Sequence, residues 1–266
     1  MFAWRFIVNV VNNRAIITTL ALRELLSRYV GSVGGPFWSI IEPVATVLVF
    51  WFVFSVGFKA IGPKGEPFII YFLPGYIIWY YFSQTISSNV QSIISNAYLV
   101  KQIKFPTEII PLINLASSLF PHLVMISVVV IATILTLGVL PVTFIFLPVF
   151  LLGTILFSLG ISWALSSLQV FFRDIGHSTG IILNLWFWLT PICWHSSLMP
   201  PSLKWFIVLN PIYYLIEGYR YSLTGLSTNL VGWTYLSLYF WGITLLLLLI
   251  GGMVFRRLKP QYADVL

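Results

Sequence analysis

The sequence predicts an all-α integral membrane protein with six transmembrane helices, an N-terminal amphipathic interface helix and short re-entrant helices between spans five and six. Hydrophobic residues make up 59% of the 266 residues and charged residues only 8%, which is more apolar surface than a water-soluble domain can bury. The apolar runs are long and unbroken, whereas a membrane β-barrel would show short alternating segments. No separate soluble domain fits, so residues 1–266 form one membrane domain. Its expected parts are an interface-helix region (1–35), a six-span bundle (36–255) and a tail (256–266).

An amphipathic helix is predicted from Arg14 to Val30, within the longest segment outside a span. In its second half Glu24 and Arg28 are spaced i, i+4 and can pair on one side of the helix. The other side is apolar and carries Leu22, Leu25, Leu26 and Tyr29. A helix of this kind lies in the membrane interface. It either only orients the first span or also binds a partner.

The spans are assigned to runs of roughly 20 mainly apolar residues, the length that a helix needs to cross a bilayer. Glu42 lies inside the first span, where it is either a functional group or simply reaches the interface. His122, in the third span, is interpreted as a buried, hydrogen-bonded group rather than a ligand. Gly153 and Gly160, in the fourth span, are small enough to let helices approach closely. The predicted spans cover residues 36–58, 68–95, 108–138, 142–171, 174–190 and 233–255.

The fifth span is predicted to end where a series of prolines begins. A proline lacks the backbone donor and clashes with the preceding turn, so Pro191 should kink or end the helix. Beyond it the chain stays apolar but is cut by Pro200, Pro201 and Pro211 into pieces too short to cross a bilayer. These pieces are predicted to be re-entrant or interfacial helices that cap the far side of the bundle.

The distribution of basic residues predicts that both termini are cytoplasmic. In this orientation the outer side carries only Lys59, Lys64, Lys204 and Arg220. The cytoplasmic side carries Arg5, Arg14, Arg23, Arg28, Lys101, Lys104, Arg173, Arg256, Arg257 and Lys259. The asymmetry agrees with the positive-inside rule, which the opposite orientation would violate. The formal charge of +7 is therefore attributed to topology rather than to nucleic-acid binding.

Several functional classes are disfavoured by what the sequence lacks. No G-x-x-x-x-G-K-[ST] phosphate loop occurs, so the chain does not bind and hydrolyse ATP by that route. The single cysteine, Cys193, excludes an internal disulfide and a cysteine cluster for metal. No row of intramembrane carboxylates suggests a proton or sodium relay, and the three histidines are scattered.

The fifth span carries a face that mixes aromatic and polar groups. Asn184 and Trp188 are spaced i, i+4, and His177 precedes Asn184 by seven residues. An aromatic ring stacks on the C–H face of a sugar, while amide and imidazole groups bond its hydroxyls. This face therefore suits a sugar chain, and the alternative is that it serves helix packing.

Short motifs also follow one another in a set order along nearly the whole chain. They are Arg28-Tyr29 through Gly34, Trp38 with Pro43, Leu73-Pro74-Gly75 with Trp79, Lys101 to Pro106, Phe172-Arg173-Asp174-Ile175, Trp186 through Ile192, Met199-Pro200 and Asn210-Pro211. In this order and spacing the sequence resembles the permease subunits of type-2 ABC exporters that move lipid-linked polysaccharides such as O-antigen, capsule and teichoic acid. One departure is Gly35-Pro36 ahead of Trp38, where family members often carry a plainer apolar pair, so the start of span one stays open.

The resemblance implies a homodimer joined to two copies of a separate cytoplasmic ABC ATPase. That partner would bind ATP and Mg²⁺, so no cofactor is expected in this chain. The resemblance further implies residence in the bacterial inner membrane and export of lipid-linked polysaccharide, with O-antigen the first candidate. The alternatives are a secondary transporter and an intramembrane enzyme that acts on lipid-linked sugars.

Candidate site residues fall into three groups, and none is catalytic or metal-binding. The N-terminal helix and the basic loop after span two are expected to receive the ATPase's motion through Arg23, Glu24, Tyr98, Lys101 and Lys104. The resemblance implies a conduit at the dimer axis along spans one and five, lined by Trp38, Asn184 and Trp188. Arg28 either binds the pyrophosphate of a lipid-linked substrate or is a structural, phospholipid-contacting arginine.

Overall fold

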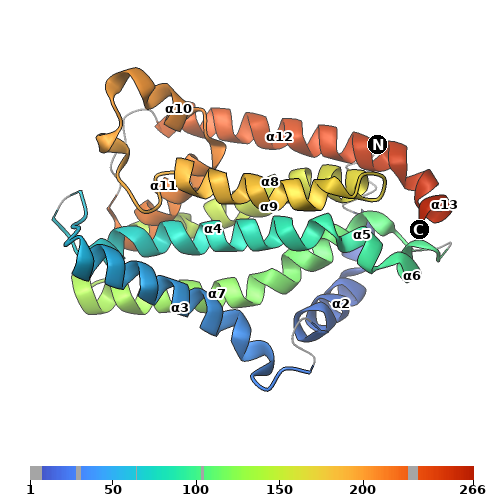
Figure 1. The fold of residues 1–266 in the computed structure, drawn as a ribbon, viewed down its shortest axis with the longest axis horizontal. Coiled ribbons are helices and arrows are strands. Elements are labelled where there is room, and N and C mark those ends of the chain that lie inside the picture. The colour runs from blue at the N-terminus through green and yellow to red at the C-terminus, as the bar shows by residue number, and fades with distance from the viewer. Residues whose placement is uncertain (1–7, 28–30, 64, 103–104, 227–232) are drawn as a thin grey trace.

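The computed structural model describes residues 8–27, 31–63, 65–102, 105–226 and 233–266. Among these residues every regular element is a helix or helical turn, apart from one isolated bridge between Ile61 and Pro67. This confirms the predicted all-α class. The helices at the predicted spans run roughly along the long axis, with α3 and α7 more oblique (Figure 1). They are α3 (Trp38–Trp51), α4 (Phe68–Val90), α7 (Ile110–Leu137), α8 (Leu147–Gln169), α9 (Asp174–Leu189) and α12 (Trp233–Leu258).

Shorter elements gather at the two ends of this bundle. The described N-terminal segment contributes α2 (Arg14–Ser27). At one end lie α5 (Ser92–Ser95), α6 (Ala97–Val100), α13 (Tyr262–Val265) and the C-terminus, and at the other lies α10 (Lys204–Val208), close to α11 (Pro211–Thr224) (Figure 1). Short 3-10 turns cover Gly35–Phe37, Thr107–Ile109, Val142–Phe146, Ser196–Leu198, Pro201–Leu203 and Lys259–Gln261, and a π-turn, Phe52–Gly57, extends α3.

Four of the described helices are long and apolar enough to cross a membrane. They are Trp38–Gly57, Thr107–Leu137, Val142–Gln169 and Trp233–Gln261, so the chain is an integral membrane protein. The two other predicted spans correspond to α4 and α9. Helix α9 has 16 residues, short of the roughly 20 that a span needs, and α4 mixes tyrosine, serine and glutamine into its apolar run.

The breaks between helices lie where the sequence places proline, glycine and asparagine. Helix α9 ends at Leu189, and Thr190 ahead of Pro191 is extended (ψ 134°), as expected for a residue that precedes proline. Helix α7 ends at Gly138, whose left-handed φ of 78° favours glycine. Asn210 caps α11, because its side chain accepts a hydrogen bond from the Ile212 amide at 3.2 Å.

Helix α4 forms the centre of the core. It packs against α7, α8 and α11, and most of its residues are buried. His122 of α7 is 3% exposed. Its Nε2 lies 2.9 Å from the Tyr219 hydroxyl, and its ring stacks on Tyr81 with centroids 4.6 Å apart. The interpretation of His122 as a buried, hydrogen-bonded group is confirmed.

One of the cations counted on the outer side does not lie on the protein surface. Arg220 is completely buried, with 0% exposure, and its guanidinium is hydrogen-bonded within the protein.

Glycines bring α8 and α12 into backbone contact. A Cβ placed on Gly160 would lie 2.8 Å from the Leu247 carbonyl carbon, and one on Gly251 would meet the Gly160 carbonyl oxygen. Gly153 lies against the Phe240 ring of α12 in the same way. The predicted close approach at Gly153 and Gly160 is confirmed, and its partner is α12.

This contact predicts that Gly251→Ala destabilises the protein. The added methyl group meets backbone rather than a flexible side chain, and such overpacking costs about 1–3 kcal/mol. We expect a melting temperature several degrees lower for the detergent-solubilised protein. Gly242→Ala is the matched control. Gly242 lies on the same helix, α12, and a Cβ there would meet nothing within 4 Å. Equal melting temperatures for the two variants would contradict the assigned α8–α12 packing.

Candidate functional site

A cavity of about 180 Å³ separates α2 from the α5–α6 connection. Three of the five predicted coupling residues, Arg23, Glu24 and Tyr98, line it together, although they come from two separate segments. Lys101 is exposed directly after α6, and Lys104 lies outside the described residues. The cavity thus presents both charge signs and one phenol ring to whatever binds there. The other lining residues are Leu20, Ser27, Asn96, Leu99 and Ile113.

Helix α2 is attached to α7 by a small core of its own. Ile17 and Ala21 are buried against Ile109 and Ile113, away from the main core. These two α2 residues are four apart and, with Leu25, form one buried stripe. Of the predicted apolar side, Leu25 is buried whereas Leu22 and Leu26 are 58% and 48% exposed. Helix α2 therefore has two apolar faces, one on the protein and one outward.

Glu108 ties the ends of the described chain to the start of α7, and sequence reasoning did not identify it. One carboxylate oxygen accepts a hydrogen bond from the Asn9 amide at 3.0 Å, and the other lies 2.7 Å from Lys259 Nζ. The Glu108 carbonyl accepts a hydrogen bond from the Trp163 indole at 3.1 Å. Glu108 therefore joins the segment before α2 and the segment after α12 to the turn that begins α7.

The predicted mixed face of α9 is largely exposed in the monomer. Asn184, His177 and Trp188 are all exposed, with Trp188 at 54%. Trp186 differs, because its indole donates to Asn210 Oδ1 at 3.0 Å and it packs edge-on against Trp79. The two tryptophans therefore have separate roles, one in packing and one on the surface.

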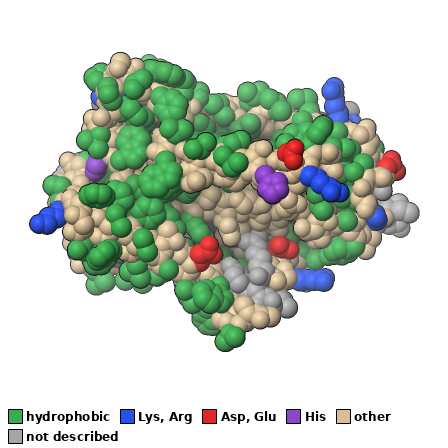
Figure 2. Space-filling view, in the orientation of Figure 1, with side chains coloured by type: hydrophobic (Ala, Val, Ile, Leu, Met, Phe, Trp, Pro, Cys, Tyr) green, Lys and Arg blue, Asp and Glu red, His purple; other side chains and the backbone are tan. Residues whose placement is uncertain are grey.

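A groove of about 330 Å³ runs between α4 and the first half of α9. Helix α4 contributes Ser87, and Gln91 follows directly after its last residue. Gly180 of α9 faces open space, because a Cβ there would meet nothing within 4 Å, and Gly176 also lines the groove. Figure 2 shows this side of the molecule, with a hollowed region near its middle and apolar side chains gathered mainly at one end. The groove continues the line of Asn184 and Trp188 along α9. Its remaining lining residues are Val90, Arg173, His177 and Thr179.

The structure does not bring Trp38 next to Trp188. The Trp188 ring contacts Phe50 of α3, with centroids 6.4 Å apart, while Trp38 begins α3 twelve residues earlier. Twelve residues of helix span about 18 Å. Trp38 is 46% exposed and Glu42 is also exposed on α3. Arg28, the candidate head-group residue, lies outside the described residues.

No metal centre is formed by the described part of the chain. Within those residues no group of three or more His, Cys, Asp and Glu side chains could hold a metal ion.

Comparisons with known proteins relate the chain to membrane transport. The family described as ABC-2 type transporter matches residues 16–224. The chain is 28% identical over 254 residues to the O-antigen export system permease protein RfbA of Klebsiella pneumoniae, covering 94% of this chain and 95% of that protein. It is 26% identical over 219 residues to the protein of the same name from Myxococcus xanthus, covering 81% of this chain and 83% of that protein.

The geometry of α9 predicts unequal stability effects for substitutions of its two tryptophans. Trp186→Phe removes the hydrogen bond to Asn210 and leaves a gap beside Trp79, which should cost about 1–3 kcal/mol. Trp188→Phe alters a surface ring and should leave the free energy of unfolding nearly unchanged. Thermal unfolding of the two purified variants checks this. A larger loss for Trp188→Phe than for Trp186→Phe would contradict the assignment.

Proposed function

Because the chain belongs to the ABC-2 type transporter family, we propose that it is the permease subunit of an ATP-driven exporter whose cargo is lipid-linked O-antigen. The observation that supports this choice of cargo is similarity to permeases named for O-antigen export. The similarity covers most of this chain and most of each relative. The family assigns the chain to membrane transport rather than to catalysis. ATP and Mg²⁺ are bound by a separate ABC ATPase, since the sequence has no phosphate loop.

In the working complex, two copies of this chain associate with two ATPase subunits in the bacterial inner membrane. Each copy has six spans, with α4 and α9 serving as the second and fifth, and with short re-entrant helices after α9. Helix α9 can contribute to a crossing despite its 16 residues, because the segment after it carries the chain further. Both termini are cytoplasmic, as the basic residues at the α5–α6 and C-terminal end indicate.

The ATPase docks in the cavity between α2 and the α5–α6 connection. Support comes from the convergence of Arg23, Glu24 and Tyr98 there and from the attachment of α2 to α7 through Ile109 and Ile113. Movement of the ATPase against this surface would therefore be transmitted to the start of α7, a long helix, rather than absorbed by a flexible loop. Lys101 and Lys104 extend the basic side of the same surface.

The glycan moves along the exposed face of α9, between two copies of the chain. Gln91 and His177 offer hydrogen-bonding groups at the groove, and Asn184 and Trp188 continue the path outward. Trp38 lines the same route from α3. Arg28 binds the pyrophosphate of the lipid carrier at the cytoplasmic surface, where a guanidinium can contact phosphate with two donors.

Reconstitution tests the proposed function. The permease is placed in proteoliposomes with an ABC ATPase that co-purifies with it, and lipid-linked O-antigen is added on the ATPase side. We expect ATP-dependent appearance of glycan on the opposite side. Transport by the chain alone, driven by an ion gradient, would instead identify a secondary transporter. Conversion of the lipid substrate by the chain alone would identify an enzyme.

Charge reversal at the docking cavity should uncouple the ATPase. Glu24→Lys combined with Lys101→Glu inverts charges of both signs on one surface, so ATPase co-purification and export should both fall while membrane insertion stays normal. Lys204→Glu is the matched control, because Lys204 is exposed at the opposite end of the bundle. Normal co-purification and export in the double variant would refute the docking surface.

The export role of Trp188 depends on its aromatic face. Trp188→Phe keeps a ring that can stack on a sugar and should export nearly normally, whereas Trp188→Leu keeps only apolar bulk and should slow export. Stacking on aromatic rings in nucleic-acid channels is worth about 1–3 kcal/mol per base, and a moving glycan must be held less tightly. Trp205→Leu, which removes an exposed tryptophan from α10, is the control. Equal export rates for the two Trp188 variants would contradict a role of Trp188 in lining the conduit.

A further inference from the structure

The turn that follows α9 is buried, although it is not helical. Pro191, Ile192 and Cys193 are buried, and the chain from Thr190 to Met199 contains no α-helix. Its carbonyl groups therefore lack the partners that a helix provides. A buried carbonyl without a hydrogen bond is costly, so donors must come from elsewhere.

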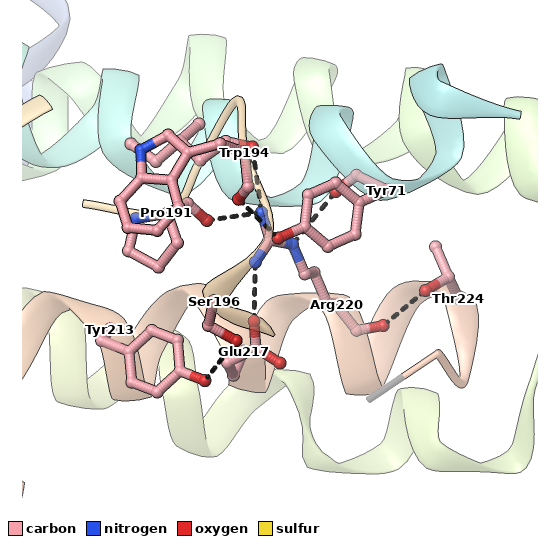
Figure 3. A network of polar contacts seen from close by, with 9 residues as sticks. Tyr71, Pro191, Trp194, Ser196, Tyr213, Glu217, Arg220 and Thr224 are labelled. Atoms are coloured by element: carbon pink, nitrogen blue, oxygen red, sulfur yellow. Dashed lines mark hydrogen bonds and ion pairs between the residues drawn. The ribbon is translucent and has the colours of Figure 1, made fainter. Parts of the chain in front are cut away.

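Arg220 of α11 supplies two of these donors. Its Nη2 donates to the carbonyls of Pro191 at 2.9 Å and Ile192 at 3.0 Å. Its Nε donates to the Tyr71 carbonyl of α4 at 3.0 Å, and its Nη1 forms an ion pair with Glu217 at 2.6 Å. One guanidinium thus joins two helices to the turn (Figure 3).

Tyr71 completes the connection. The Arg220 guanidinium carbon lies 3.7 Å from the centre of the Tyr71 ring, and the Tyr71 hydroxyl donates to the Trp194 carbonyl at 2.9 Å. The Trp194 indole in turn donates to the Trp188 carbonyl at 3.1 Å. A continuous path of hydrogen bonds therefore leads from α4 and α11, through the turn, to the residue with the exposed ring on α9.

The approach of Arg220 to α4 requires a glycine. A Cβ on Gly75 would lie 3.2 Å from Arg220 Nη2 and 3.1 Å from the Ile216 side chain. The Leu-Pro-Gly motif of the second predicted span therefore has a local reason, which is room for the guanidinium.

The two halves of α9 are held very differently. Its outer end is fixed by Arg220 and also by Asn210, whose side chain bonds the Thr190 hydroxyl at 2.8 Å and the Trp186 indole. Its inner half contributes the buried residues of α9, Thr179 and Leu183, but it also borders the 330 Å³ groove. The groove leaves room for motion of α9 relative to α4 at the inner end.

We propose that Arg220, with Glu217 and Tyr71, is a positioning group for export that anchors the turn after α9 to α4 and α11 and so makes the outer end of α9 a fixed pivot. The anchor keeps the Trp188 ring in place while the inner half of α9 tilts to admit substrate. Arginine is required because its planar guanidinium reaches four acceptors at once. The donors of a lysine ammonium all lie on one nitrogen atom and cannot span these acceptors. The link to export depends on the proposed function, but the anchor itself does not.

The single cysteine of the chain reports directly on this turn. Cys193 is 6% exposed and sits between the anchored carbonyls of Ile192 and Trp194. Its reaction with a small maleimide, measured on the purified protein in nanodiscs without ATPase or substrate, follows opening of the turn. Cys193→Ser verifies that all labelling comes from this thiol.

Three variants weaken the anchor to different degrees. Arg220→Lys loses the fork, Glu217→Gln loses the counter-charge, and Tyr71→Phe loses only the hydroxyl bond to Trp194. We expect Cys193 to label about tenfold faster in the first two, as for loss of a charged hydrogen bond, with a smaller increase in Tyr71→Phe. Tyr262→Phe is the matched control, because it deletes a buried hydroxyl bond, to Ser167 at 2.7 Å, far from the turn.

Export is then measured for the same variants with the ATPase present. We expect Arg220→Lys and Glu217→Gln to slow export while the ATPase still co-purifies. Labelling as slow as wild type in Glu217→Gln and Tyr71→Phe would overturn the anchor, even if Arg220→Lys does not fold. Faster labelling with unchanged export would overturn the positioning role, whereas absence of O-antigen export by the wild-type complex would count against the proposed function alone.

Discussion

Satisfaction of buried backbone polar groups is the constraint on which the structure depends. Helices meet it internally along the four candidate spans, where no water is available. At two places a side chain supplies the missing partner. Asn210 caps the start of its own helix, α11, and Arg220 of α11 donates to carbonyls of the turn after α9. The position of the irregular segment after α9 is thereby set by α11 and, through Tyr71, by α4.

Much of the fold could be predicted because its signals are local. Pro191 ends α9 and Gly138 ends α7, each through its own backbone preference. Gly160 marks a close helix contact because only a residue without Cβ fits there. The helix partner at that contact, α12, could not be predicted, since it depends on packing between segments far apart in the sequence. The number of spans was harder, because α4 is a core helix with polar residues and α9 is short.

The residues that sequence reasoning missed act over long distances in the chain. Arg220 was only counted among the basic residues of the outer side, and its burial was not predicted. The signal that could have placed it inside was Glu217, three residues earlier in an otherwise apolar helix. Glu108 was likewise read only as the start of a span, and its partners Asn9 and Lys259 lie 99 and 151 residues away. Of the predicted coupling residues, Arg23, Glu24 and Tyr98 were brought together, because a polar surface helix and a polar loop at the same membrane face have few other places to lie.

The contact between Gly160 and Gly251 limits how many independent movements a protomer has. Backbone meets backbone where Gly160 and Gly251 face each other, so α8 and α12 cannot slide past one another there without a collision. The pair therefore serves as a stiff frame of the subunit. A change of shape is then taken up more easily by helices with few buried residues, α3 and α9.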